Sequence, residues 1–308
     1  MIKYLPLMFT LLLSTTVKAD RNWIDSSRHK GLDRAAVQVP FNVYATSPLQ
    51  PQHLPVLKRL TKAKAFFDSQ FAVDLPFAVM MLDNAHWESI AYYPPPGMPQ
   101  AWKGNIILGL DNSAMASKVR NALTPLPADI KSSLFQTYGK ELNLDRFYRD
   151  ILAIHELAHL YHFYEGTTPQ RKWLQELFAT LAMVTFVHNR CVECFEEMDV
   201  YPQFILSSGK RGIEYTSLNN FETMYLPGLG PKNYEWFQMH FYQWAQEILA
   251  QDGEEALVKL RRFIIDTDLS STTRMDNETL INQLRENVSS HLATLVERWE
   301  STNATSTQ

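Results

Sequence analysis

The chain has 308 residues, of which 33 are acidic and 29 are basic, and its net charge at pH 7 is −4. Because it contains neither a basic stripe nor a basic amphipathic helix, the sequence argues against nucleic acid and anionic membranes as partners. The length is sufficient for one domain with a large core, or for two closely joined lobes that flank a cleft.

The first residues have the pattern of a cleavable signal peptide. Lys3 provides a basic start, an apolar run extends from Tyr4 to Leu13, and a small-residue cleavage site ends at Ala19. The apolar run is too short to span a bilayer comfortably and no cysteine follows the cleavage site to carry a lipid, so no membrane anchor is expected. Cleavage would leave 27 basic and 33 acidic residues, a net charge of −6. We therefore expect an exported protein, periplasmic or secreted.

The first third of the chain is predicted to form a small mixed sheet. Strands are expected at 76–82 (PFAVMML), 87–93 (WESIAYY) and 104–110 (GNIILGL), because these runs are apolar and are separated by turn-rich segments. The run PPPG at 94–97 can sustain neither a helix nor a strand ladder. An exposed loop is therefore expected there.

The segment HELAH at 155–159 carries the strongest functional signal in the sequence. Apolar residues recur at helical spacing before it and through it, so the segment is predicted to lie on a helix. His155 and His159 would then stand one turn apart, with their Cβ atoms about 5–6 Å from each other, and both could reach one ion. Glu156 could hold a water against that ion as a general base. Histidines without an ion are the alternative, since the pattern also occurs by chance.

A second helix is predicted at 169–188, and it begins with a proline, which is favoured in the first turn. Since only a few residues separate the two helices, they should pack antiparallel and bring Glu176 opposite His155 and His159. Three protein ligands and one open position are typical of catalytic zinc sites, whereas structural sites have four protein ligands. The sequence therefore predicts one Zn²⁺ ion bound by these three residues. A solvated surface carboxylate is the alternative for Glu176.

HELAH and the segment WLQELFAT around Glu176 resemble the gluzincins, the zinc peptidases that include thermolysin and the aminopeptidase N group, over about 104–263. The resemblance implies a zincin-like domain that hydrolyses peptide bonds, with Glu156 taking a proton from the attacking water. The chain has no G-x-M-E-N segment, through which the aminopeptidase N group binds the substrate amino terminus, and it has Leu177 where that group has glycine. These differences favour an endopeptidase over an aminopeptidase.

The resemblance also implies a strand that binds the substrate. In zincins the strand just before the active-site helix lies at the edge of the cleft and pairs antiparallel with an extended substrate. The run at 104–110 is the candidate, with Asn105, Ile107 and Gly109 as substrate-binding residues, and strand addition at an unpaired edge is the physical basis. An ordinary covered strand is the alternative.

A later helix is expected to supply a donor for the oxyanion, as in the gluzincins. The segment at 234–250 has an aromatic helical pattern similar to that of the helix which carries the catalytic tyrosine in the aminopeptidase N group. Tyr234 is the first candidate, and His240 and Tyr242 are alternatives, because the sequence does not fix the rotation of this helix. Aromatic residues at helical spacing also form cores without any catalytic role.

Cys191 and Cys194 are the only cysteines of the chain, and they follow the second predicted zinc helix. In an exported chain the expected state is a local disulfide between them. A second metal site is an alternative that would need further ligands from Glu193, Glu196 or His188. A redox-active pair is another alternative, but no thioredoxin-like strand precedes the motif.

The expected fold class is α+β, in a single zincin-like domain over residues 20–300 with an N-terminal α/β lobe at about 40–165 and a helical lobe at about 166–300. Residues 301–308 are expected to form a disordered tail. Strands are predicted only in the first third, and further helices are predicted at 53–70, 128–138, 254–265 and 277–299.

The predicted function is thus an exported zinc-dependent peptidase that cleaves a peptide or protein substrate. Two other classes fit parts of the sequence. A binding protein could keep the gluzincin fold, or even the zinc, without efficient turnover. A thiol-disulfide protein could use Cys191 and Cys194, and its activity would then depend on thiols and not respond to metal chelators. The sequence gives no indication of an oligomeric state.

Overall fold

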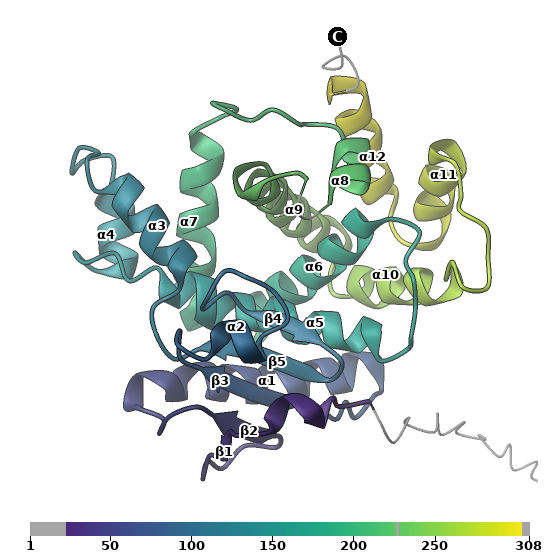
Figure 1. Ribbon diagram of the computed structural model, residues 1–308. Coiled ribbons are helices and arrows are strands. Elements are labelled where there is room, and N and C mark those ends of the chain that lie inside the picture. The colour runs from purple at the N-terminus through teal and green to yellow at the C-terminus, as the bar shows by residue number, and fades with distance from the viewer. Residues whose placement is uncertain (1–22, 226–227, 304–308) are drawn as a thin grey trace, which may run out of the picture.

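The computed structural model describes residues 23–225 and 228–303, over which the chain has a mixed α+β fold (Figure 1). The predicted signal peptide at 1–19 lies outside the described residues, as does the end of the predicted tail at 304–308. Residues 301–303 were expected in that tail but belong to the last helix, whose end packs on the domain: Asn303 is buried and accepts a hydrogen bond of 3.0 Å from Lys210. Among the described residues, no helix has both the length and the apolar run that crossing a bilayer requires.

A small mixed sheet is formed by the first third of the chain. Its central strands β2, β3 and β5 are parallel, and the edge strands β1 and β4 are antiparallel to their neighbours. Every residue of β3 and β5 is buried, which is typical of parallel strands covered on both faces and explains their continuous apolar sequences. The strands predicted at 76–82 and 104–110 are therefore confirmed. The strand order is β1 (Asp33–Arg34), β2 (Asn42–Ala45), β3 (Ala78–Leu82), β5 (Asn105–Gly109) and β4 (Gln100–Trp102).

The strand predicted at 87–93 is wrong, because the short helix α2 (Trp87–Ile90) begins there and a loop follows it. The Asp83 carboxylate accepts a hydrogen bond of 3.0 Å from the His86 N–H just before this helix. A side chain that bonds to the backbone three residues on favours a turn over an extended strand. The apolar side chains of this segment are still buried, since Trp87 packs beside β3 and β5.

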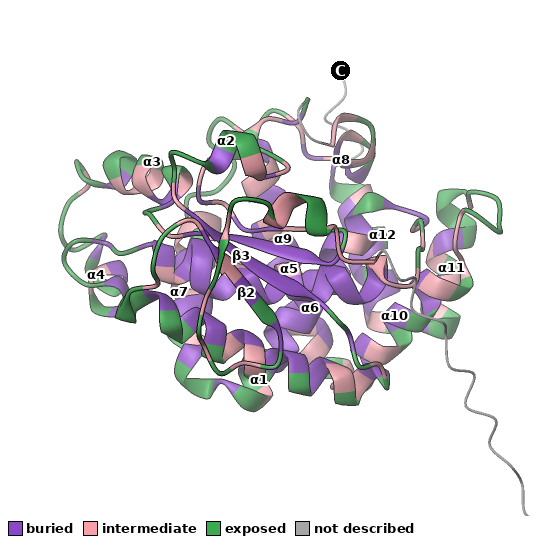
Figure 2. Cartoon of the chain, turned by 60° about the horizontal axis from the view of Figure 1, so that its bottom comes forward, coloured by how far each residue is buried: buried purple, intermediate pink, exposed green. Residues whose placement is uncertain are grey.

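Helices cover the sheet and form the rest of the domain. α1 (Leu54–Phe71) and α5 (Leu152–Phe163) pack on one face of the sheet, and α2 packs on the other. Figure 2 shows the buried strand β3 and the partly buried strand β2 in front of the largely buried helices α5 and α6. The remaining helices are α3 (Ala114–Leu123), α4 (Ser132–Tyr138), α6 (Lys172–Arg190), α7 (Phe195–Ser207), α8 (Leu218–Met224), α9 (Pro231–Asp252), α10 (Glu255–Asp266), α11 (Asn277–Asn287) and α12 (Ser290–Asn303).

Most of the predicted helices are present, with ends that differ by a few residues, but α3, α7 and α8 were not predicted. The single helix predicted at 277–299 is wrong, because the chain turns at Ser289 between α11 and α12. The Ser289 hydroxyl donates to Asp252 Oδ2 (2.6 Å) and accepts from the Leu292 N–H (3.0 Å). A serine that satisfies a free N–H of the first turn starts a new helix at that point.

The helices α5 and α6 form the closely connected pair that the sequence predicts. The turn between them contains Gly166, whose positive φ of 69° is readily adopted only by a residue without a Cβ atom. α6 runs through the centre of the molecule, where it packs against α5 on one side and α9 on the other (Figure 1). The two helices are thereby held in the core along most of their length.

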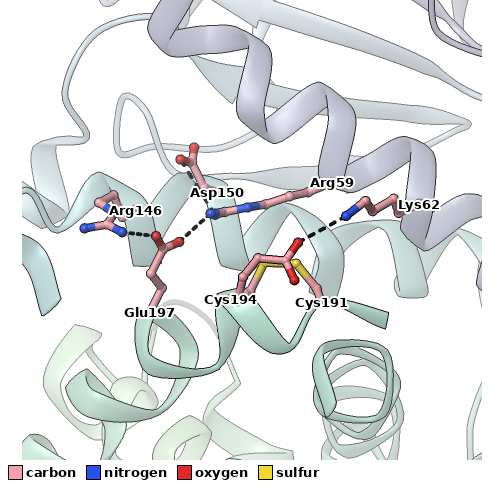
Figure 3. The surroundings of a disulfide bond; sticks show 8 residues. Arg59, Lys62, Arg146, Asp150, Cys191, Cys194 and Glu197 are labelled. Carbon is pink, nitrogen blue, oxygen red and sulfur yellow. Dashed lines mark hydrogen bonds and ion pairs between the residues drawn. A yellow bond between two sulfur atoms is a disulfide. The ribbon is translucent and has the colours of Figure 1, made fainter. Parts of the chain in front are cut away.

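An ion-pair cluster anchors the start of α5 to α1 and α7 (Figure 3). Glu197 of α7 pairs with Arg59 of α1 (2.6 Å) and with Arg146, which lies on a π-helical turn that leads into α5. Asp150 of the same turn lies 3.9 Å from Arg59. The cluster sits beside the disulfide that joins the end of α6 to α7 (Figure 3). Three segments that are distant in sequence, α1, the turn before α5 and the α6–α7 connection, are therefore fixed to one another here.

Replacing Glu197 by alanine is expected to lower the free energy of unfolding by about 3 kcal/mol, because it removes the close partner of Arg59 in a largely buried site and leaves only the Asp150 carboxylate, 3.9 Å away. We place the loss at the low end of the usual range, since the Arg59 side chain is 16% exposed. Urea unfolding of the purified variant measures the change. Glu193→Ala is the matched control, because the Lys62–Glu193 pair lies in the same region with side chains 56% and 66% exposed. That change should stay within about 0.5 kcal/mol, and equal losses in the two variants would contradict the prediction.

Candidate metal centre

The structure brings His155, His159 and Glu176 together at the packing interface of α5 and α6. The two histidines lie one turn apart on α5, and Glu176 projects from the second turn of α6. Their ligand atoms all lie within 4.8 Å of one another, and all three residues are buried. The predicted grouping of these three residues is therefore confirmed.

The separations of the donor atoms fit one zinc ion. The Nε2 atoms of His155 and His159 are 3.0 Å apart, and they lie 3.4 Å and 3.6 Å from Glu176 Oε2. In a tetrahedral site with bonds of about 2.0–2.1 Å, neighbouring donors are about 3.3 Å apart. Two imidazole nitrogens and one carboxylate oxygen also match the donor types that zinc takes in catalytic sites.

Several side chains orient these donors. Thr180, one turn after Glu176, lies with its hydroxyl 3.3 Å from His155 Nδ1, which leaves Nε2 of that ring directed at the other donors. Glu176 accepts hydrogen bonds from Tyr225 at Oε1 (2.6 Å), and from Gln238 (2.8 Å) and Tyr234 (3.3 Å) at Oε2. The carboxylate is thus held on both of its oxygens.

The charges at this centre favour metal binding. Burial acts to raise the pKa of Glu176, but the neighbouring histidines outweigh this effect and hold the pKa well below its usual range, so the group is a carboxylate at neutral pH. Burial lowers the pKa of His155, which keeps its imidazole neutral with a free lone pair. For His159, burial lowers the pKa but the Glu176 carboxylate raises it by more. A metal ion would displace the proton from His159, because a histidine ligand must be neutral.

Glu156 lies beside the three donors and is partly exposed. Burial of its carboxylate, together with the charge of Glu176, raises the pKa to about 7, although His159 and a hydrogen bond from the Ala101 backbone act in the opposite direction. A pKa near neutrality suits a group that accepts a proton and then returns it. Ala101 belongs to the edge strand β4, so Glu156 sits between the metal centre and the edge of the sheet.

Of the three candidate oxyanion donors, only Tyr234 reaches the centre. Its hydroxyl lies 3.3 Å from Glu176, and burial and the Glu176 charge raise its pKa, so the phenol remains protonated. The His240 ring packs against Trp236, with ring centroids 4.4 Å apart. The Tyr242 hydroxyl donates to Asp199 (2.6 Å), on the α7 side of α9. His240 and Tyr242 thus contact other residues, and Tyr234 is the candidate that the structure places beside Glu176.

Tyr225 and Gln238 belong to the centre but were not identified from the sequence. Gln238 lies four residues after Tyr234 on α9, so the two side chains share one face of the helix. This spacing is visible in the sequence and could have identified Gln238. Tyr225 follows α8, a helix of only seven residues that has no strong periodic pattern. Its contact with Glu176 spans 49 residues of sequence, and no local pattern predicts such a contact.

The expectation that β5 is the edge strand is wrong, because β5 lies between β3 and β4. Asn105 and Ile107 are fully buried, and the Asn105 amide is occupied by the Asp25 carbonyl and His29. Gly109 packs closely on a neighbouring loop, where a Cβ atom would lie 2.8 Å from Gly97 Cα. These three residues therefore do not face a cleft at the sheet edge.

The edge position belongs to β4, which a tight hairpin turn connects to β5. Lys103 and Gly104 form the turn, and both have positive φ values, 44° and 69°. Positive φ at both central residues is the signature of the type I′ turn that joins antiparallel strands. The sequence prediction missed this hairpin because β4 has only three residues and a lysine stands where such turns prefer asparagine or aspartate.

Cys191 and Cys194 form a disulfide in the structure, as expected. Both cysteines are buried, with 1% and 0% exposure. Because the two sulfur atoms are bonded to each other, they are not available as metal ligands, although a Glu193 oxygen lies near them. A buried disulfide is also poorly accessible to an exchanging thiol. The structure thus gives no support to a second metal site or to a redox-active pair at these positions.

The candidate site consists of His155, His159 and Glu176 as metal-binding residues, with Glu156 and Tyr234 beside them. The chain matches no protein-family model, no curated protein and no solved structure.

Proposed function

We propose that this protein is a zinc-dependent peptidase, and more specifically an endopeptidase, that hydrolyses peptide bonds with Glu156 as the general base. One observation carries the proposal: the donor atoms of His155, His159 and Glu176 converge at the separations of a tetrahedral zinc site, with Glu156 next to them. Three protein ligands leave one position for water or substrate, as in catalytic zinc sites.

The surroundings of the centre support a zincin-like fold for this domain. Helix α5 packs on a small sheet whose antiparallel edge strand, β4, contacts the same helix (Figure 1). We assign substrate binding to β4, along whose free edge an extended peptide would pair antiparallel. Trp102 on this strand is 37% exposed, and its ring lies edge-on to Phe163 with centroids 5.5 Å apart. Trp102 would contact a side chain of the bound peptide.

The reaction would proceed by attack of water on the scissile carbonyl. When bound, zinc supplies Lewis acidity, which lowers the pKa of a water to about 7 and polarises the carbonyl. Glu156 would accept a proton from the attacking water and return it to the leaving amine. The Tyr234 hydroxyl donates a hydrogen bond to the developing oxyanion. One well-placed donor of this kind stabilises the transition state by about 3–4 kcal/mol.

Export of the protein is part of the proposal. It is supported by the signal-peptide pattern at 1–19 and by the disulfide, since disulfides persist mainly in oxidising compartments. The peptidase would then act on peptides or proteins in the periplasm or outside the cell.

Metal analysis of the purified protein, combined with cleavage of a peptide library, tests the proposed function. We expect one zinc per chain, cleavage at internal peptide bonds, loss of cleavage with 1,10-phenanthroline and recovery when zinc is added back. The double variant His155→Ala/His159→Ala is the control, and it should neither bind zinc nor cleave. Zinc binding without any cleavage would favour a binding protein that retains the site, and absence of zinc would overturn the proposal.

A further inference from the structure

The two oxygens of the Glu176 carboxylate have different surroundings. Oε2 faces the imidazoles of His155 and His159, at 3.4 Å and 3.6 Å from their Nε2 atoms. Oε1 accepts a hydrogen bond of 2.6 Å from the Tyr225 hydroxyl, the shortest of the contacts that Glu176 makes with hydrogen-bond donors. The oxygen that faces the histidines and the oxygen that Tyr225 holds are therefore distinct.

We propose that Tyr225 is a positioning residue for the metal: by holding Oε1, it turns the Glu176 carboxylate so that Oε2 points to the ion. This inference rests on the zinc site proposed above. The terminal torsion of a glutamate has a broad energy profile, so an unrestrained carboxylate could rotate to angles at which neither oxygen points to the ion. Hydrogen bonds to ligating carboxylates fix this orientation, and loss of such a bond typically lowers metal affinity 10- to 100-fold.

The Tyr225 ring is fixed by protein contacts alone. Tyr225 directly follows α8, whose first turn is stabilised by a capping box. Its ring packs against Phe221 and Tyr234, with centroid separations of 5.3 Å and 6.0 Å. The Lys172 ammonium lies 5.2 Å above the ring centroid, within the range of a cation–π contact. These contacts direct the hydroxyl to Glu176 without requiring an ion or a substrate.

Tyr234 is placed for a different role on the same carboxylate. Its hydroxyl lies 3.3 Å from Oε2, the oxygen that would bind the ion, and Gln238 donates to that oxygen at 2.8 Å. An ion on Oε2 would compete with the long hydrogen bond from Tyr234. The Tyr234 hydroxyl would then be free to donate a hydrogen bond to the substrate. Tyr225 is therefore expected to set metal affinity, whereas Tyr234 is expected to set turnover.

The test is the zinc affinity of Tyr225→Phe, measured by competition with a chelator of known affinity. Phenylalanine keeps the ring that packs against Phe221, so the fold is retained, which circular dichroism checks. Tyr242→Phe is the matched control, because Tyr242 also donates a 2.6 Å hydrogen bond to a carboxylate, that of Asp199, which is not near the metal centre. Thermal unfolding of the two metal-free variants should show similar effects, since each loses one hydrogen bond of this kind.

We expect Tyr225→Phe to bind zinc 10- to 100-fold more weakly than the wild type, and Tyr242→Phe to bind it within about twofold. Tyr234→Phe should keep its zinc affinity within a few-fold and lose turnover instead. Wild-type affinity in Tyr225→Phe, with zinc bound normally by the wild type, would overturn this inference and leave the proposed function standing. A wild-type protein that binds no zinc would overturn both.

Discussion

Glu156→Gln is expected to keep one zinc per chain and to lower the turnover of a cleavable peptide by a factor of about 10²–10⁴. Glutamine has nearly the shape of glutamate, and its carbonyl oxygen can still accept the hydrogen bond from Ala101, so the site keeps its geometry. It cannot accept a proton from water at neutral pH, however, and the reaction loses its general base. Steady-state kinetics on a peptide identified by library cleavage measures the change.

Glu141→Gln is a suitable control for this variant, because Glu141 is exposed and lies before α5, outside the group of candidate ligands. The control should have wild-type turnover and wild-type zinc content. Full turnover in Glu156→Gln would remove Glu156 from the mechanism. Loss of zinc in that variant would show instead that Glu156 contributes to metal binding, and the kinetic result would then no longer report on a base.

Glu176→Gln is expected to lose zinc almost completely during dialysis, and to lose peptide cleavage with it. The substitution removes the only anionic donor, and its effect on affinity should exceed the 10- to 100-fold that results from removing a hydrogen bond to a metal ligand. Glutamine fits the buried site, and its amide can still interact with the Tyr225 and Gln238 side chains around it. Elemental analysis after dialysis against metal-free buffer measures the retained zinc.

The comparison for this variant is Glu235→Gln on α9. Glu235 also accepts hydrogen bonds from two tyrosine hydroxyls, those of Tyr148 and Tyr201, but it does not belong to the group of metal-binding donors. The Glu235→Gln variant should keep its zinc. Retention of zinc at wild-type affinity by Glu176→Gln would show that the ion, if bound, is held elsewhere in the chain.

The grouping of His155, His159 and Glu176 could be predicted from the sequence because its geometry is local. The separation of His155 and His159 is fixed by the helix repeat, and the position of Glu176 follows from a short connection between two adjacent helices. The buried strands β3 and β5 were predicted for a similar reason, since strands covered on both faces are apolar throughout. In each case a few neighbouring residues contain the whole signal.

The residues that were missed depend on contacts between distant segments. Tyr225 reaches Glu176 only because α8 packs on α6, and nothing in the residues around Tyr225 indicates that packing. The edge strand β4 has three residues and is defined by its pairing with β5, so its own sequence carries little strand signal. The segment at 87–93 shows the converse. Its apolar residues correctly indicate burial, but the hydrogen bond that the Asp83 carboxylate accepts from the His86 N–H favours a turn just before it, and a short helix follows.

In the proposed peptidase, the shortness of β4 would limit which substrates could be cleaved. Its three residues span roughly 10 Å, at about 3.4 Å per residue, so main-chain pairing could select only a tripeptide-sized stretch of the substrate. Such a stretch must be extended and free of its own pairing partners. Flexible termini, surface loops and unfolded chains satisfy this requirement, whereas a strand inside an intact sheet does not. Local unfolding of the target would then decide the cleavage point more strongly than a long recognition sequence.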